Sequence, residues 1–548
     1  MKKRALISVY NKDGILELTS FLSSSGWEII STGGTFKHLQ ENNIKVTDVS
    51  SVTGFPECLD GRVKTLHPAI HAGILARRDV KSHIDTLKKE NLKTIDLVCV
   101  NLYPFFEKVQ AGLSAEETIE FIDIGGPGML RSAAKNHNDV IVLTDPSDYA
   151  EVLNYLKSGG VPPDFKRRLA GKVFDLTSAY DGAIARFLLD EEYPEYLPLS
   201  LKRSQRLRYG ENAHQSASLY INTDHPGVFS GIQQLNGKEM GYNNIRDLDI
   251  AWKAVCAFGL PDAGFEAAGE ADVRAFSPKA SKAPNDNKIC VAAIKHNTPC
   301  GIAIGNNLLD TYNKVFACDP VSIFGGIVAA NTKITESTAL KLSELFLEIV
   351  AAPDFDNDAL KILKKKKNLR VIKIDRAPEE THEYIAVDGG VLVQQTDRKL
   401  LEKWEVVTKK APEDRDIDDM IFGMRAVTFV KSNAIMIVKE LSAAGIGGGQ
   451  VNRIWPAISA LQRSASALEN MSQETADSGG SPWSDSLPAR VLASDAFFPF
   501  ADIVEEAAKA GIKAIIQPGG SKNDNLSIEA CDKHGIAMVF TGTRHFKH

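Results

Sequence analysis

Short apolar runs alternate with helical patterns along the first part of the chain. The predicted strands comprise residues 5–9, 27–31, 95–101 and 139–144, with a helical stretch over residues 81–90. Between the first two strands, Ile15, Leu18 and Leu22 recur at helical spacing, Asp13 fits an N-cap, and Gly26 fits the glycine that ends a helix. Strands that alternate with helices predict an α/β fold with a mainly parallel sheet covered on both faces.

An acidic, proline-bearing stretch over residues 190–198 follows a long helical pattern and predicts a domain boundary. We therefore expect one domain over residues 1–198 and a second region over residues 199–548. The second region again mixes strands and helices, and its last part reads as a helix that begins at Asp502 followed by a strand. Two stretches, 261–288 and 464–488, are rich in small and polar residues and are predicted to be surface insertions.

Composition narrows the function classes. The 548 residues carry a formal net charge of −6, so nucleic acid is a poor default partner. The seven cysteines include no Cys-x-x-Cys pair, which argues against a disulfide framework and a cysteine zinc site. No apolar run approaches the ~18 residues of a membrane helix. The sequence thus predicts a cytoplasmic protein without membrane association.

Four loops of the first region carry the residue types of an anion site. Residues 31–35 (Ser-Thr-Gly-Gly-Thr) join a strand to a helix expected at Phe36, where glycines and free N–H groups would cradle a phosphate. In the loop over residues 60–68, Arg62 and Lys64 alternate and would form a two-cation clamp. Residues 101–105 follow a predicted strand, and the glycine-rich residues 123–135 lead into a helix expected at about Met129. Ligands of open α/β sheets lie at such strand ends.

In the second region, Lys295 and His296 follow the predicted strand over residues 289–294. An imidazole beside an ammonium group suits a general base at neutral pH. Residues 207–215 bring together a cation, a phenol, a glycine and an imidazole. Cys300 lacks the ligand spacing of a zinc deaminase, so we expect no catalytic metal.

The four loops of the first region resemble the cyclohydrolase half of the bifunctional purine biosynthesis proteins. This resemblance implies a methylglyoxal-synthase-like domain that closes formylated aminoimidazole carboxamide ribotide (FAICAR) to inosine monophosphate (IMP). The reactive residues it implies are Lys64, Tyr103, Asp123 and Lys135, and the implied substrate contacts are Ser8, Ser31, Gly33, Gly34, Arg62 and Thr65. Which of the reactive residues acts as acid and which as base stays open.

The second region resembles the transformylase half of the same family. The resemblance implies two cytidine-deaminase-like α/β subdomains without zinc, divided near residue 375, and formyl transfer from 10-formyltetrahydrofolate to the 5-amino group of the ribotide (AICAR). It implies Lys295 and His296 for the transfer step, and nucleotide or folate contacts at Arg208, Tyr209, Asn244, Phe324, Asn433, Arg453, Phe498, Arg544, Phe546 and His548. It also implies a homodimer and allows a monovalent cation.

Two alternatives remain open at this stage. A nucleotide-sensing binding protein of the same fold would not need Lys64, Asp123, Lys135, Lys295 and His296 together, yet all five are present. A zinc deaminase fused to a lyase would need the ligand spacing that the sequence lacks.

Overall fold

The computed structural model describes residues 2–103, 105–223, 225–259, 288–478 and 488–548. The chain divides into two compact units. The first consists of Met1–Lys202 and Tyr220–Pro226, and the second of Arg203–Leu219 and Gly227–His548. A small two-stranded sheet is formed by β6 (Leu201–Leu207) and β7 (Ala217–Asn222).

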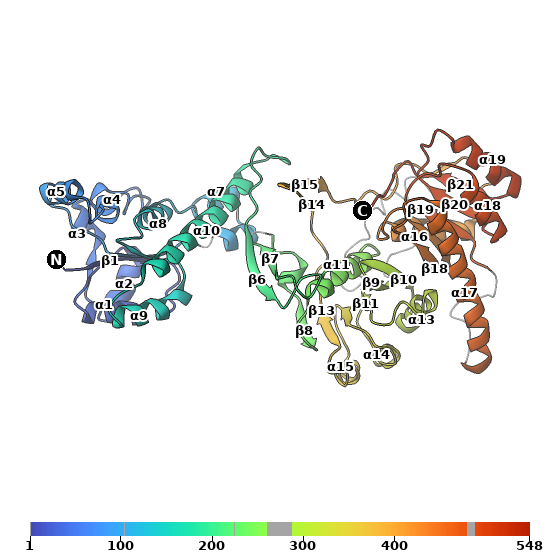
Figure 1. Cartoon of the computed structure of the whole chain (residues 1–548), viewed down its shortest axis with the longest axis horizontal. Coiled ribbons are helices and arrows are strands. Elements are labelled where there is room, and N and C mark those ends of the chain that lie inside the picture. The colour runs from blue at the N-terminus through green and yellow to red at the C-terminus, as the bar shows by residue number, and fades with distance from the viewer. Residues whose placement is uncertain (1, 104, 224, 260–287, 479–487) are drawn as a thin grey trace. The chain divides into compact units, whose positions relative to one another are not determined.

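The first unit, blue to teal in Figure 1, is built on a five-stranded sheet of order β3-β2-β1-β4-β5. Every pairing in this sheet is parallel. Its apolar strand residues are buried against the flanking helices in one core, as the alternation of strands and helices predicts. The strands are β1 (Arg4–Val9), β2 (Glu28–Ser31), β3 (Val46–Asp48), β4 (Leu97–Asn101) and β5 (Ile141–Leu143). The helices are α1 (Ile15–Ser24), α2 (Gly33–Glu41), α3 (Val49–Thr53), α4 (Pro68–Leu75), α5 (Lys81–Lys89), α6 (Phe105–Gln110), α7 (Ala115–Ile119), α8 (Gly125–Lys135), α9 (Tyr149–Lys157) and α10 (Pro163–Leu188).

Three predicted helix starts are wrong by one to four residues. The N-cap of α1 is Gly14, with a φ of 69°, and not Asp13. Helix α2 begins at Gly33 and not at Phe36, and α8 begins at Gly125 and not near Met129. Glycine composition suggested loops, but these glycines form first helical turns: Gly33 has a φ of 55°, and a Cβ at Gly125 or Gly126 would lie 2.7 Å or 2.4 Å from another side chain.

The second unit contains a twelve-stranded sheet of order β16-β21-β20-β19-β17-β18-β10-β9-β11-β12-β13-β8. Its strands are β8 (Gln233–Asn236), β9 (Ile289–Lys295), β10 (Thr298–Gly305), β11 (Ile327–Ala330), β12 (Ile349–Ala352), β13 (Arg370–Lys373), β16 (Glu405–Val406), β17 (Ile435–Lys439), β18 (Ser442–Gly447), β19 (Val491–Ser494), β20 (Ala514–Gln517) and β21 (Ala537–Phe540). The described helices are α11 (Tyr242–Cys256), α13 (Leu308–Cys318), α14 (Glu336–Ser343), α15 (Asn357–Lys364), α16 (Asp414–Val427), α17 (Ile454–Ser478), α18 (Asp502–Lys509) and α19 (Asp524–His534).

This sheet consists of two halves with the same order of elements, visible in Figure 1 as a green-to-yellow part and an orange-to-red part. The halves meet where β10 pairs antiparallel with β18 through Ala303 and Ser442. Helices α11 and α16 share one buried core on one face of the sheet. Two further cores lie beneath α13 to α15 in the first half and beneath α17 to α19 in the second. The halves are therefore related by an approximate two-fold axis between β10 and β18.

The two predicted insertions turn out differently. Residues 261–287 of the first lie outside the described residues. Of the second, residues 464–478 are helical and continue α17. Strong helix formers (Ala, Leu, Glu, Met and Gln) alternate there with the polar residues. Residues 479–487 lie outside the described part.

The hairpin of β14 (His382–Val387) and β15 (Gly390–Gln395) forms a separate two-stranded sheet whose side chains are largely exposed. All seven cysteines are free. None of the described helices is long and apolar enough to cross a membrane.

Candidate functional sites

The first candidate site lies at the carboxyl edge of the parallel sheet, where the strand order reverses between β1 and β4. Asn101 ends β4, and its side-chain oxygen accepts hydrogen bonds from the backbone of Tyr10 (2.5 Å) and Asn11 (2.9 Å). The loop after β1 is thereby tied to the end of β4. Ser8 and Ser31 lie at the ends of β1 and β2 at this same edge.

The turn over residues 31–35 leaves backbone N–H groups for an anion, while two of its hydroxyl groups are already engaged. Ser31 donates to the carbonyl of Ile7 (2.7 Å), and Thr35 donates to the carbonyl of Val9 (2.9 Å). The first N–H groups of α2 have no partner within the helix. An anion at this edge would therefore meet amide donors of Gly33 and Gly34.

Lys12 is a further cation at this edge that the sequence analysis did not single out. Its Nζ donates to the carbonyls of Val9 and Tyr10, and burial lowers the pKa of the ammonium group. The sequence signal that could have identified Lys12 is its position three residues after β1, which ends at the carboxyl edge of the sheet.

Arg62 and Lys64 point to different partners, so the predicted two-cation clamp is not formed in this structure. Arg62 pairs with Glu120, and Lys64 pairs with Glu57 at 3.1 Å. A side chain at Gly33 would place its Cβ 3.6 Å from Lys64 Nζ, so the ammonium group lies against the start of α2.

The glycine-rich first turn of α8 lies against Asp123 and Thr65. A Cβ at Gly125 would lie 2.7 Å from Thr65 Oγ1, and a Cβ at Gly126 would lie 2.4 Å from Asp123 Oδ2. The Asp123 carboxylate accepts from the Gly126 N–H at 2.8 Å. Burial raises its pKa, and this hydrogen bond opposes the rise. Lys64, Thr65 and Asp123 thus connect the start of α2 to the start of α8.

Two residues of the predicted set lie apart from this carboxylate or are exposed. Lys135 is the last residue of α8, so about 15 Å of helix separates its backbone from the start of the helix beside Asp123. Tyr103 is 47% exposed and packs edge-to-face on Tyr10 with ring centroids 5.8 Å apart.

The second candidate site includes the turn between β9 and β10. Lys295 ends β9 and donates from Nζ to the carbonyl of Phe324 at 2.7 Å. His296 is exposed at the edge of the sheet. Asn244 lies at the start of α11, where its side-chain oxygen accepts from the Gly241 N–H at 3.0 Å.

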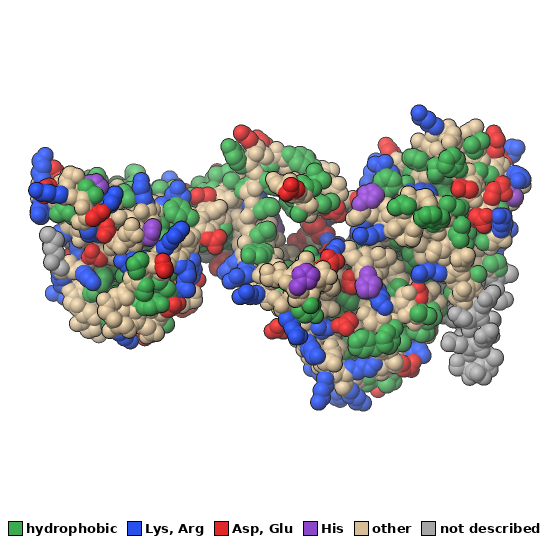
Figure 2. Space-filling view, in the orientation of Figure 1, with side chains coloured by type: hydrophobic (Ala, Val, Ile, Leu, Met, Phe, Trp, Pro, Cys, Tyr) green, Lys and Arg blue, Asp and Glu red, His purple; other side chains and the backbone are tan. Residues whose placement is uncertain are grey.

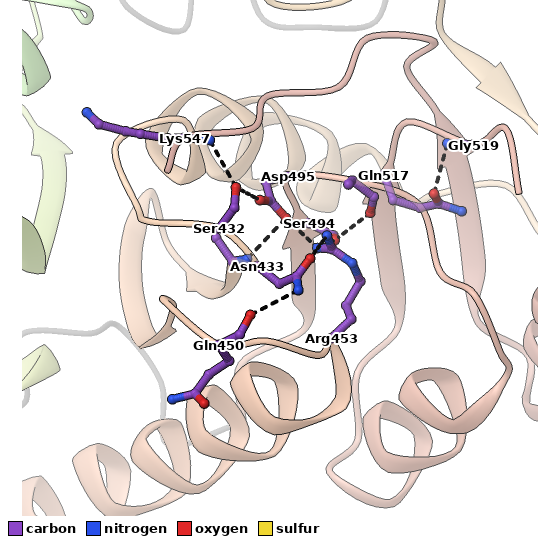
Figure 3. Close-up of polar contacts among 11 residues, drawn as sticks. Ser432, Asn433, Gln450, Arg453, Ser494, Asp495, Gln517, Gly519 and Lys547 are labelled. Atoms are coloured by element: carbon purple, nitrogen blue, oxygen red, sulfur yellow. Dashed lines mark hydrogen bonds and ion pairs between the residues drawn. The ribbon is translucent and has the colours of Figure 1, made fainter. Parts of the chain in front are cut away.

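A buried polar cluster lies at the start of β17 and the end of β19 (Figure 3). Asp495 is fully buried and forms an ion pair with Arg453. Its carboxylate also accepts from the Ser432 hydroxyl and from the Ala434 N–H (3.1 Å). Arg453 further donates to Ser494 Oγ (3.0 Å) and to the side-chain oxygen of Asn433.

The C-terminal segment is fastened to this cluster. The Ser432 N–H donates to the Lys547 carbonyl (2.8 Å), and the Lys547 N–H donates to Ser432 Oγ (3.0 Å). In Figure 3 the side chain of Lys547 points away from Asp495. Burial lowers its pKa to about 8, a feature that its sequence position does not signal.

Both groups of residues lie at the same edge of the twelve-stranded sheet. Strands β9 and β17 run in opposite directions, because β9, β10, β18 and β17 are successively antiparallel. The end of β9 therefore faces the same way as the start of β17, three inter-strand spacings or about 14 Å apart. One edge thus carries the Lys295–His296 turn and the Asp495 cluster.

The remaining predicted contacts differ in exposure. Arg208, Tyr209, Phe324, Arg544, Phe546 and His548 are exposed. The Arg544 guanidinium stacks on Phe546 at 4.3 Å. Phe498 is fully buried in the core beneath α17 to α19, so its ring supports this part of the fold in the single chain.

Among the described residues, no three His, Cys, Asp or Glu side chains form a group that could hold a metal ion. The donors at both edges are instead amides, lysines, arginines and hydroxyls, which suit anionic and polar organic ligands.

Comparisons with known proteins match both units. A family model described as "AICARFT/IMPCHase bienzyme" matches residues 133–463, and one described as "MGS-like domain" matches residues 14–128. Proteins named "Bifunctional purine biosynthesis protein PurH" from Clostridium kluyveri and Clostridium acetobutylicum are 54% and 56% identical over 549 residues, covering 100% of each chain. A solved structure named "Crystal structure of ForH" is 36% identical, covers 34% of this chain and 100% of that chain, and has a TM-score of 0.31.

Proposed function

The chain belongs to the AICARFT/IMPCHase bienzyme family, and from this we infer that it is a bifunctional enzyme of purine biosynthesis, an AICAR transformylase and IMP cyclohydrolase. The observation that carries the function is the identity of 54–56% to bifunctional purine biosynthesis proteins over the whole chain. The alternative of a binding protein without catalysis is not favoured by this match. The test is whether purified protein converts AICAR and 10-formyltetrahydrofolate to IMP without added metal.

We propose that residues 1–198 carry the cyclohydrolase activity. In ring closure, the carboxamide nitrogen attacks the formyl carbon, and water leaves after proton transfer. Lys64 lies against the amide donors of α2, so its ammonium group can stabilise the developing oxyanion. Asp123, whose pKa burial raises, can exchange a proton with the leaving oxygen.

In this proposal, Ser8, Ser31, Gly33, Gly34, Arg62 and Thr65 contact the ribotide, and Tyr103 is a further reactive residue. Lys135 reaches the reaction only if its helix end meets the ligand from another direction, for example across a dimer. A fragment ending at residue 198 should close FAICAR to IMP, and a folded but inactive fragment would contradict this division.

We propose that residues 199–548, with subdomains divided near residue 375, carry the transformylase activity. The 5-amino nitrogen of AICAR attacks the formyl carbon of 10-formyltetrahydrofolate, and the bond from that carbon to the folate nitrogen breaks. His296 accepts the amine proton, and Lys295 orients the reacting groups at the end of β9. Contacts to nucleotide or folate are assigned to Arg208, Tyr209, Asn244, Phe324, Asn433, Arg453, Phe498, Arg544, Phe546 and His548.

The co-substrate is accordingly 10-formyltetrahydrofolate, with AICAR, FAICAR and IMP as the other ligands. The proposal includes no catalytic metal and leaves room for a structural monovalent cation. It also includes no nucleic acid or membrane partner and a cytoplasmic location, in keeping with the net charge of −6.

We further propose a homodimer, supported by the hairpin of β14 and β15. Tyr384, Ile385, Val387, Val391 and Leu392 are 42–60% exposed on it, and Figure 2 shows hydrophobic side chains, in green, at the place of this hairpin in Figure 1. An isolated two-stranded hairpin is marginally stable in water, so an apolar partner surface would stabilise it. Sedimentation should give a dimer, and full transformylase activity in a strictly monomeric protein would contradict the proposal.

A further inference from the structure

The turn that carries His296 has a backbone conformation that its residues rarely adopt. His296 and Asn297 form the two-residue connection between β9 and β10, with φ angles of 54° and 60°. Such turns strongly favour Asn-Gly, because both positions require a left-handed conformation. The His-Asn pair therefore needs support from outside the turn.

Asp247 on α11 supplies that support. Its Oδ1 accepts from the Asn297 N–H at 2.6 Å. Burial raises the pKa of this carboxyl group, while hydrogen bonds from the amides of Asn297 and His296 lower it. The carboxylate is half-buried beneath the turn, whereas the imidazole above it is exposed. The backbone amide of His296 thus meets a half-buried carboxylate, whereas its side chain is exposed to solvent.

The second half of the sheet repeats the same arrangement without a histidine. Glu440 and Leu441 connect β17 to β18 with φ angles of 48° and 58°. Asp419 accepts from their N–H groups at 3.1 Å and 2.6 Å. Asp247 and Asp419 are each the sixth residue of their helices, α11 and α16. The two carboxylates thus share one role: each accepts hydrogen bonds from the backbone of a two-residue turn.

We propose that Asp247 is a positioning residue for formyl transfer, whose carboxylate fixes the turn and thereby the place of the His296 imidazole at the sheet edge. This inference rests on the proposed role of His296 as proton acceptor. A general base must lie within hydrogen-bond reach of the proton it removes, so a displacement of about 1 Å can cost ~10²-fold in rate. Asp419 holds a turn that carries no histidine, and so it is the matched control.

The experiment compares Asp247→Ala, Asp247→Asn and Asp419→Ala in the full-length protein. Asp247→Ala should lower kcat for formyl transfer by ~10–100-fold and leave the KM for AICAR within about two-fold. Asp247→Asn keeps an oxygen that accepts from the turn and should restore most of kcat. Asp419→Ala should lower the resistance to urea yet keep kcat within about two-fold of the parent. Cyclohydrolase activity on preformed FAICAR should be unchanged in all three.

Four results would overturn the proposal. One is a parent-like kcat in Asp247→Ala when His296→Ala is inactive, and another is an equal loss of kcat in Asp419→Ala. A third is no rescue by Asp247→Asn in a folded protein. If the alanine variant fails to fold, Asp247→Glu replaces it, because this substitution shifts the carboxylate by one methylene. A parent-like kcat in Asp247→Glu would be the fourth contradicting result. If His296→Ala itself transfers formyl at the parent rate, the proposed function of His296 fails, which is a distinct outcome.

Discussion

Removing the charge of Asp495 should destabilise the second unit strongly. Asp495 and Arg453 form an ion pair whose side chains are 0% and 5% exposed. The variant Asp495→Asn keeps an oxygen for the Ala434 N–H, and Arg453 keeps Ser494 as an acceptor. What it loses is the negative charge opposite a buried guanidinium. Breaking one partner of a buried pair costs about 3–5 kcal/mol, which lowers the folding equilibrium constant by roughly 10²–10⁴-fold.

The assay is urea unfolding followed by tryptophan fluorescence in a Trp27→Phe background. The remaining tryptophans among the described residues, including the buried Trp252, then lie in the second unit. If the first unit carries the cyclohydrolase, as proposed above, that activity reports whether this unit is intact. Glu344→Gln is the control, because it breaks an ion pair with Lys341 whose side chains are 60% and 43% exposed, and such pairs contribute about 0–1 kcal/mol.

The reasoning would be refuted if Asp495→Asn and Glu344→Gln shifted the unfolding midpoint equally. The double variant Arg453→Met with Asp495→Asn gives a second check. Because it removes both buried charges, it should be less destabilised than the sum of the two single variants. Strict additivity would mean that the two charges do not interact.

Three further outcomes are expected. Lys64→Met should lower cyclohydrolase turnover by ~10²–10³-fold, measured on FAICAR, with formyl transfer unchanged, because it removes the oxyanion donor proposed above; equal losses in both activities would point to misfolding. Gly126→Ala should impair the cyclohydrolase in the same assay, because its Cβ would lie 2.4 Å from Asp123 Oδ2, whereas Gly171→Ala on α10, with nothing within 4 Å of its Cβ, should not. Burial lowers the pKa of the His71 imidazole below 6.5, so below pH 6.5 this side chain binds fewer protons in the native state than in the unfolded chain. The contribution of neutral His71 to stability is therefore present above pH 6.5 and is lost as the pH falls through the folded pKa. Urea midpoints between pH 7.5 and 5.5 should therefore depend less on pH in His71→Asn, and parallel curves would refute this.

The parallel sheet of the first unit was predictable because its strands are short apolar runs separated by amphipathic helices, a local signal of two covered faces. The starts of α2 and α8 were not. At α8, a Cβ at Gly125 would lie 2.7 Å from Thr65 Oγ1, which is distant in sequence, and at α2 Gly33 has a φ of 55°. Turn composition alone reveals neither feature.

The candidate sites show the same limit. The residue types predicted a cationic loop and a lysine–histidine pair at strand ends. They did not predict which side chains pair with these residues. Glu120 pairs with Arg62 from 58 positions away, and Asp247 holds the Asn297 amide from 50 positions away. Similarly, β10 and β18 join the two halves of the large sheet through the pairing of Ala303 with Ser442. The sequence pattern of each half gives no sign of this pairing.

The outer strands of the twelve-stranded sheet bear on the solubility of the protein. Each sheet edge offers unpaired N–H and C=O groups to any extended chain, and wide sheets risk growth by strand addition. Here the outermost strands are β8, with four residues, and β16, with two. Such short edges provide few hydrogen bonds to an incoming strand. Lengthening β16 by substitutions that favour extended backbone should therefore promote self-association through this edge, while leaving the interior of the sheet untouched.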